Sequence, residues 1–571
     1  MSSPTTVDIE APLPTPPPLI PPIPTPPLGL LILRNVSICQ PWSPILERLY
    51  GLRREDLPFI AEEGLNYDIT ISNGRISRID VAASVAGDVP HSINRSFGSE
   101  SPAFIFPGLI DSLTRPFTLT ADEIGSGLLT LAHGVTTIRS VSGDGIAASE
   151  TATAIATGQR IGPRSFYTGR ELDGPSPARI GAQACASPKA AQKAAETRVS
   201  EGASYIAIGP YLTGESLVNV LQIAKEKGLK TVGYGNGVTE SLHLSDTVEI
   251  RGTPWGGAPT EFENYLKALN DGTVTTTEST VVGHIATPAL TPLFHLAHES
   301  NSADLNEGKI VLPSTIILSE CQCNTMGSAL PSPCPSLRLT SSNGIMPHCC
   351  SSRLARAWLP AHITKVAWGD ISGTQCRVQP LLPYGRSISQ DIRNIAPGAF
   401  HGALRVINTL NKNGAVIHAG SDSGSAHVLP GLGLHTELLL LSAAGLGDEG
   451  ALASATILPA CALATLPRFQ KQSQTSLTSL SSSITTSKLA WLGFIVPGAL
   501  ADFVISRADP RSNLSQSLST IIATVAAGQI FTAEDLDTRI RAHSTINSDS
   551  LASNALPLVA PLLRVAMNWW K

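Results

Sequence analysis

The sequence predicts an α/β protein with a (β/α)8 barrel in its middle and β-structure at both ends. Three observations support this prediction. Short β-rich runs alternate with helical patterns from residue 107 onward, two alternating runs flank Asn73-Gly74, and β-type runs return after residue 489. Strands that alternate with helices favour a parallel sheet or barrel, because a parallel connection needs a long crossover.

The first part of the chain predicts a tail followed by a β-domain. Residues 11–28 are so rich in proline that we expect 1–28 to be an extended, solvated tail. Residues 29–38 form a β-rich run, and 67–81 contain two alternating runs around Asn73-Gly74, a strong hairpin signal. We therefore assign 29–106 to the first portion of a β-domain.

The middle of the chain, 107–469, predicts the barrel. Its expected strands are 106–112, 134–141, 165–170, 204–212, 230–235, 246–252, 309–318 and 414–422. Helical spacing is clear in 214–228, where Leu217, Val220 and Ala224 share one face and Gly228 supplies a stop. In such barrels the active site lies at the carboxyl ends of the strands.

Two segments interrupt these periods, and β-structure follows the second. Residues 321–360 are rich in Ser, Pro and Cys, and 470–488 form a Ser/Thr-rich linker. The cysteines of 321–360 fit no structural zinc spacing, which leaves a disordered insertion, a translated non-coding segment or an irregular zinc site as alternatives. We assign 489–535, with β-type runs at 500–506 and 520–531, to the second portion of the β-domain and 536–571 to a tail.

Composition excludes several classes of function. The 571 residues carry 40 Lys+Arg against 45 Asp+Glu, a net charge of −5, and only 5% aromatic residues. This balance disfavours nucleic-acid binding. The sequence has no secretory signal pattern and no uninterrupted apolar run of membrane-spanning length. Nine cysteines in a chain of this length do not make a disulfide scaffold, so the cytosol is the expected location.

The order of several segments resembles the amidohydrolase superfamily, in its imidazolonepropionase-like and prolidase-like branch. The residues that carry the resemblance span about 29–531 and include DITISNGRISRID, FPGLIDS, HGVTTIRSV, GASYIAIGPYL, GAVIHAGSDSG, LPGLGLHTELLLLSAAGL, ALASATILPACALATL and LGFIVPGALADFVI. The resemblance implies a small composite β-sandwich from both chain ends beside the barrel. It also implies metal-assisted hydrolysis of carbon–nitrogen bonds, in which zinc or another divalent ion activates a bound water.

The ligand positions implied by the resemblance are mostly occupied by residues that cannot bind a metal. The Asp-x-His-x-His segment reads Asp111-Ser112-Leu113-Thr114, the strand-4 lysine falls on Ala207, the strand-5 histidine on Tyr234 or Gly235, and the strand-6 histidine on Ile250 or Arg251. Only the strand-8 aspartate, Asp422, matches. One carboxylate does not hold a catalytic ion, so we expect no metal and no cofactor.

These observations leave three functional hypotheses. The first is a catalytically impaired amidohydrolase that binds a small molecule in the remaining pocket or has no selectable function. The second is an active hydrolase with a rebuilt or metal-free site that acts on a non-peptide, cyclic amide-type carbon–nitrogen bond. The third is an interaction protein that uses the Pro-rich and Ser/Thr-rich segments. If the protein is active, we expect Asp422 to accept a proton and Arg251 and His427 to contact substrate. The alternative for Asp422 is a cap that accepts hydrogen bonds from loop amides. The sequence does not determine the oligomeric state.

Overall fold

The computed structural model describes residues 30–82, 92–98, 101–115, 123–141, 143–177, 181–209, 211–234, 247–249, 284–286, 404–464 except 406, 409, 413, 415, 424–427 and 429, and 492–541. The segments 1–28, 321–360 and 470–488 lie outside the described residues, as does the expected strand 309–318.

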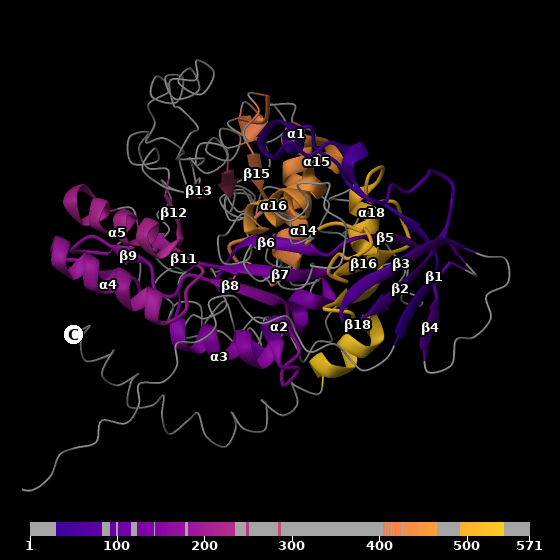
Figure 1. Ribbon diagram of the computed structural model, residues 1–571, viewed down its shortest axis with the longest axis horizontal. Coiled ribbons are helices and arrows are strands. Elements are labelled where there is room, and N and C mark those ends of the chain that lie inside the picture. The colour runs from indigo at the N-terminus through magenta and orange to yellow at the C-terminus, as the bar shows by residue number, and fades with distance from the viewer. Residues whose placement is uncertain are drawn as a thin grey trace, which may run out of the picture.

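The described chain is a mixed α/β fold (Figure 1). Its strands are β1 (Leu30–Ile38), β2 (Tyr67–Ser72), β3 (Arg75–Val81), β4 (Ser92–Ser96), β5 (Phe104–Pro107), β6 (Leu109–Thr114), β7 (Val135–Ser140), β8 (Arg164–Tyr167), β9 (Leu172–Asp173), β10 (Gln183–Ala184), β11 (Tyr205–Ile208), β12 (Lys230–Tyr234), β13 (Thr247–Glu249), β14 (His284–Ala286), β15 (Val416–His418), β16 (Phe503–Ser506), β17 (Ile521–Ala526) and β18 (Gln529–Thr532). Its helices include α1 (Ile45–Tyr50), α2 (Glu123–Ala132), α3 (Gly145–Ala156), α4 (Pro188–Ser200), α5 (Gly214–Lys227), α14 (Leu432–Leu441), α15 (Gly447–Ser454), α16 (Ile457–Ala464) and α18 (Leu514–Ser519), with a 3-10 turn η1 (Arg54–Asp56) and a π-helical turn η7 (Ser442–Leu446), and 533–541 are also helical.

One sheet combines strands from both ends of the described chain. Its order is β18-β17-β16-β5-β1-β2-β3, with β4 also paired to β1. The two ends meet where β16 pairs antiparallel with β5. Alternate residues of β2 are buried, as expected for a strand that covers a core with one face. The predicted β-runs near both ends therefore belong to a single sheet.

Two tight hairpins shape this sheet. The predicted turn at Asn73-Gly74 is confirmed, with φ values of 52° and 70° that place both residues in the left-handed region. The expected run 520–531 is instead two strands, β17 and β18, joined at Ala527 and Gly528 with φ values of 50° and 79°. Two consecutive left-handed residues make the turn that connects antiparallel strands, and an apolar run does not reveal it when alanine takes the first position.

The parallel strands form two further sheets. Their orders are β6-β7-β8 and β10-β9-β11-β12-β13-β14-β15. Backbone hydrogen bonds join the two sheets at two places, from Ser112 N to Ala419 O at 2.9 Å and from Ser204 N to Tyr167 O at 2.8 Å. The neighbour of β15 is β14, His284–Ala286, which the sequence reasoning did not predict because it placed the preceding strand at 309–318.

Helices lie beside the parallel strands (Figure 1), with α4 and α5 near β9, β11 and β12 and with α16 against β6 and β15. The predicted helix at 214–228 is confirmed as α5. It buries Leu217, Val220 and Ala224 and ends at Gly228, whose φ of 66° is left-handed. Glycine is favoured there because it adopts this conformation without a Cβ penalty.

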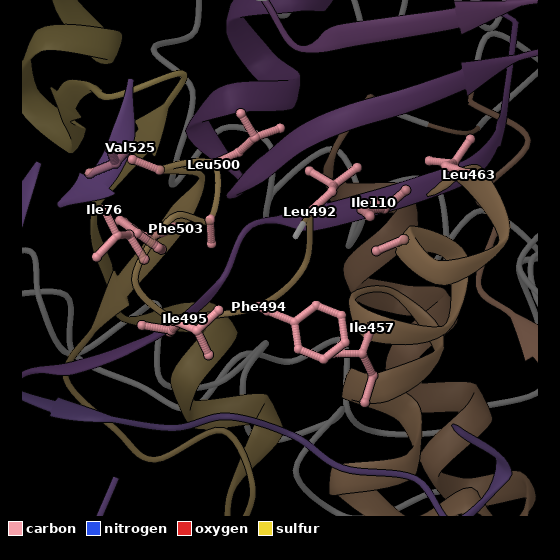
Figure 2. Close-up of a cluster of buried hydrophobic side chains, with 14 of the residues drawn as sticks. Ile76, Ile110, Ile457, Leu463, Leu492, Phe494, Ile495, Leu500, Phe503 and Val525 are labelled. Carbon is pink, nitrogen blue, oxygen red and sulfur yellow. The ribbon is translucent and has the colours of Figure 1, made fainter. Parts of the chain in front are cut away.

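The largest hydrophobic core lies between the combined sheet, β6 and α16. Figure 2 shows Phe494 beside Ile457 of α16, with Leu492 near Ile110 of β6. Phe494 is 2% exposed, and Ile457 and Ile110 are 0% and 1% exposed. Segment 492–500 thus packs between the parallel strands and the combined sheet, and links the two parts of the fold.

No single helix among the described residues has the length and apolar character to cross a bilayer. One helix pair, Leu432–Ser454 with Ile457–Leu463, passes that test together but is bent by 51°.

Candidate functional site

Polar side chains meet where β6, β7 and β15 end. Asp111 lies within β6, Arg115 follows its last residue, and Asp422 lies four residues beyond β15. The segment after β15 runs beside β6, since Asp422 N donates to Leu113 O at 2.8 Å and Arg115 N donates to Ser423 O at 2.6 Å. This pairing brings together residues that are about three hundred positions apart in the sequence.

Asp111 is fully buried and accepts hydrogen bonds that connect β6 with the segment after β15. One carboxyl oxygen accepts from Ser421 N at 2.9 Å and from Leu113 N at 3.3 Å. The other lies 2.5 Å from Ser421 Oγ. Burial raises the pKa of Asp111 to about 7, and the hydrogen bonds from Ser421 and Leu113 oppose that rise. Asp111 therefore links β6 to the segment after β15 through hydrogen bonds.

Asp422, the one residue that matches the implied ligand set, is paired with a guanidinium. Arg115 Nε donates to Asp422 Oδ1 at 2.6 Å, and the two side chains are 4% and 10% exposed. Arg115 Nη1 also donates to Val141 O at 2.8 Å, directly after β7. Arginine stays charged in proteins and has no lone pair to offer a metal, so this pair neutralises the carboxylate with a fixed cation.

The backbone at Asp422 is held in an uncommon conformation. Its φ is 55°, one of four positive values among the described residues other than glycine. A non-glycine residue in the left-handed region costs of order 1 kcal/mol and persists where its surroundings determine it. Here the bond from Asp422 N to Leu113 O and the ion pair with Arg115 act together to hold the residue.

A second arginine lies next to this pair, on β7. Arg139 Nε donates to Ser112 O at 2.7 Å. Its guanidinium lies 5.4 Å from the centroid of the Tyr205 ring, within the range of a cation–π contact. The end of this sheet is therefore held by two buried guanidinium groups that both bond to backbone carbonyls.

Two of the implied metal-ligand positions are apolar and buried in the same core. Leu113 stands where the Asp-x-His-x-His segment has its first histidine, and Ala207 stands where strand 4 has its lysine. They are 0% and 1% exposed and belong to one hydrophobic cluster with Phe166 and Val416. Apolar side chains therefore occupy two positions at which the resemblance implies metal ligands.

The histidine side chains that the structure describes do not complete a group of metal ligands with Asp422. His418 on β15 is buried at 1% exposure, four residues before Asp422. His133 and His435 lie ring to ring at 5.1 Å between centroids, and His435 Nε2 contacts His133 O at 2.7 Å. Burial lowers the pKa of His435 to about 3 and lowers that of His133 as well. Both imidazoles are thus neutral at pH 7 and bound within the core.

The donor set does not fit the divalent ion that the sequence resemblance implies. Within the described ranges, no group of three or more His, Cys, Asp or Glu side chains could hold a metal ion. The expected substrate contacts Arg251 and His427 lie outside the described residues, as does Gly235. Tyr234 ends β12, and its side chain is not described.

Sequence reasoning missed Arg115. Counted from Asp111, the motif Asp-x-His-x-His has its second histidine at the fifth residue, and that residue is Arg115. The prediction for this segment covered only 111–114 and therefore did not include the arginine at the second histidine position. The signal was present one residue further along.

Comparison with solved structures gives the same overall fold. The chain is similar to a protein from Bifidobacterium longum described as a prolidase, with 16% identity, 91% of this chain and 99% of that chain covered, and a TM-score of 0.54. It is similar to bottromycin amidohydrolase at 15% identity, 90% and 89% coverage and a TM-score of 0.51. It is also similar to Aspergillus niger ochratoxinase at 12% identity, 88% and 96% coverage and a TM-score of 0.51.

No family model and no curated protein sequence matches the chain. These neighbours share the fold of this chain, which agrees with the resemblance drawn from the sequence. At identities this low they say nothing about the site, which has to be argued from its residues.

Proposed function

We propose that this protein is a member of the amidohydrolase superfamily that has lost metal-dependent hydrolysis of carbon–nitrogen bonds and binds a small molecule at the strand ends. The observation that carries the proposal is the burial of Leu113 and Ala207 in one apolar cluster, beside an Asp422 that is already paired with Arg115. A hydrolytic ion needs three or more nitrogen, sulfur or oxygen ligands, and these positions supply one carboxylate.

Two parts of the proposal concern the architecture. The hydrogen bonds from Ser112 to Ala419 and from Ser204 to Tyr167 support a closed barrel made of β6, β7, β8 and β11 to β15. The pairing of β5 with β16 supports a composite β-domain built from both ends of the chain. In this architecture Asp111, Arg115 and Asp422 lie at the carboxyl-terminal mouth of the barrel, where ligands of such folds bind.

Because hydrolysis is lost, we propose that the site retains only the binding of a small molecule. Without a metal, a water with a pKa near 15.7 is too weak an acid for one aspartate to activate efficiently, and Asp422 is engaged by a guanidinium. The buried free cysteines Cys39, Cys185 and Cys461 agree with a cytosolic location for this protein.

The experiment is a pair of measurements on the purified full chain. Zinc chloride is titrated into the protein by calorimetry, and hydrolysis of a panel of N-acyl amino acids and Xaa-Pro dipeptides is followed with and without added zinc. We expect no saturable zinc site that depends on Asp422, as judged against Asp422→Asn, and no zinc-dependent turnover. Saturable binding at one ion per chain together with zinc-dependent turnover, both absent in Asp422→Asn, would establish the alternative, an active hydrolase with a rebuilt site.

A further inference from the structure

We propose that the guanidinium of Arg115 has taken the place of the metal ion and serves as the permanent cation that holds the ends of β6, β7 and β15 together. This inference rests on the proposed function, because it explains what replaces the lost ion. It concerns the chemistry of one residue, so it can be wrong even where the loss of hydrolysis is right.

The first support is the position of Arg115 in the chain. It is the residue at which the Asp-x-His-x-His segment would place its second histidine, and it contacts Asp422, the residue at the strand-8 ligand position. In the metal-binding arrangement these two side chains would both contact the cation. In this chain one of them is the cation, and the charge on Asp422 is balanced directly.

The second support is the set of contacts that Arg115 makes. Its backbone N donates to Ser423 O at 2.6 Å, its Nε to Asp422 Oδ1 at 2.6 Å, and its Nη1 to Val141 O at 2.8 Å. These partners follow β15 in two cases and β7 in the third, while Arg115 itself follows β6. A planar guanidinium with several fixed donors can bridge acceptors on different strands, as a multivalent ion does.

The third support is that Arg115 excludes a divalent ion from Asp422. Arg115 and Asp422 are both nearly inaccessible to solvent, and the neighbouring ligand position is occupied by Leu113 in the core. A divalent ion at Asp422 would be placed within contact distance of a buried positive charge. Two cations at one buried carboxylate repel each other strongly in a medium of low dielectric constant, so a divalent ion and the guanidinium do not share it.

The first test replaces the arginine cation with histidines that can bind a metal ion. Leu113→His/Arg115→His restores the two histidines and removes the guanidinium that pairs with Asp422, and Leu113→His/Arg115→His/Asp422→Asn is the matched control. We expect zinc to raise the thermal midpoint of the double variant by at least about 3 °C, with one ion bound per chain, and to leave the wild type and the triple variant unchanged. A folded double variant that takes up no zinc overturns the inference. Zinc uptake by the wild type that Asp422→Asn abolishes overturns the proposed function instead.

The second test does not depend on that variant folding. Arg115→Lys and Arg115→Met have side chains of similar length, but only lysine carries a charge. If Arg115 acts as a cation, Arg115→Lys keeps a thermal midpoint measurably above that of Arg115→Met, and high salt narrows the difference little because the site is buried. Equal midpoints for the two variants would mean that Arg115 only fills space, which contradicts the inference. The exposed pair Arg78–Asp80 supplies the control variants Arg78→Lys and Arg78→Met, for which no difference is expected.

Discussion

Protonation of Asp111 offers a quantitative test of the contact between β6 and the segment after β15. Asp111 has an ordinary pKa of 3.8 and a pKa of about 7 in the fold, because it is fully buried. Between these values the folded protein binds a proton that the unfolded chain has released. Stability from this group is therefore complete below pH 3.8 and declines as the pH rises toward 7. At 1.36 kcal/mol per pH unit, the free energy of unfolding should fall by about 2 to 3 kcal/mol between pH 5 and pH 8 through this residue alone.

The variant Asp111→Asn isolates the effect. The asparagine oxygen can still accept from Ser421 N and Leu113 N, and its NH2 group can donate to Ser421 Oγ as the protonated acid does. Urea unfolding followed by tryptophan fluorescence at pH 5 and pH 8 measures both proteins. We expect the variant to match the wild type near pH 5 and to exceed its stability at pH 8. The reasoning is refuted if the difference in stability between the two proteins is the same at both pH values.

Three further predictions, tested with five variants, concern other contacts. Arg115→Met and Asp422→Asn should each cost about 3 to 5 kcal/mol in urea unfolding, because each leaves a buried charge without its partner. Their double variant should cost clearly less than the sum, whereas additive losses would mean that the pair is not coupled. His435→Gln keeps a donor for His133 O but cannot titrate. Since the His435 pKa of about 3 lies below the ordinary 6.5, the free energy of unfolding of the wild type should fall by about 2 kcal/mol from pH 6.5 to pH 5, and that of the variant should not. Parallel plots of unfolding free energy against pH for the two proteins would contradict this assignment. Gly134→Ala should cost about 1 to 3 kcal/mol in the same assay, because its φ is 76° and a Cβ would approach Val504 Cγ2 to 2.7 Å, and an unchanged midpoint would show that the chain relaxes there freely.

Local signals in the sequence predicted much of the fold correctly. The hairpin at Asn73-Gly74 and the helix ending at Gly228 depend on backbone conformations that only a few residue types adopt readily, so their sequence marks are strong. Strand β14 was missed because its three residues, His284–Ala286, are too short a run to show a period.

The candidate site was predictable only in part. Asp422 was found because its surroundings match a recognised segment, and the absence of histidine at 111–114 was read directly. The pairing of Asp422 with Arg115 joins residues 307 positions apart, and no local pattern reports such a contact. Likewise, the rise in the pKa of Asp111 comes from burial by the folded chain and has no counterpart in composition.

The central claim is that a guanidinium–carboxylate pair and apolar side chains stand where a divalent ion would be held. The most direct test is the metal content of the full chain, purified without chelators and measured by elemental mass spectrometry for zinc, manganese, iron and nickel, with Asp422→Ala alongside. The account predicts less than about 0.1 ion per chain in both proteins, since a site without its ligands retains no ion through purification. About one ion per chain in the wild type, lost in Asp422→Ala, would contradict the account.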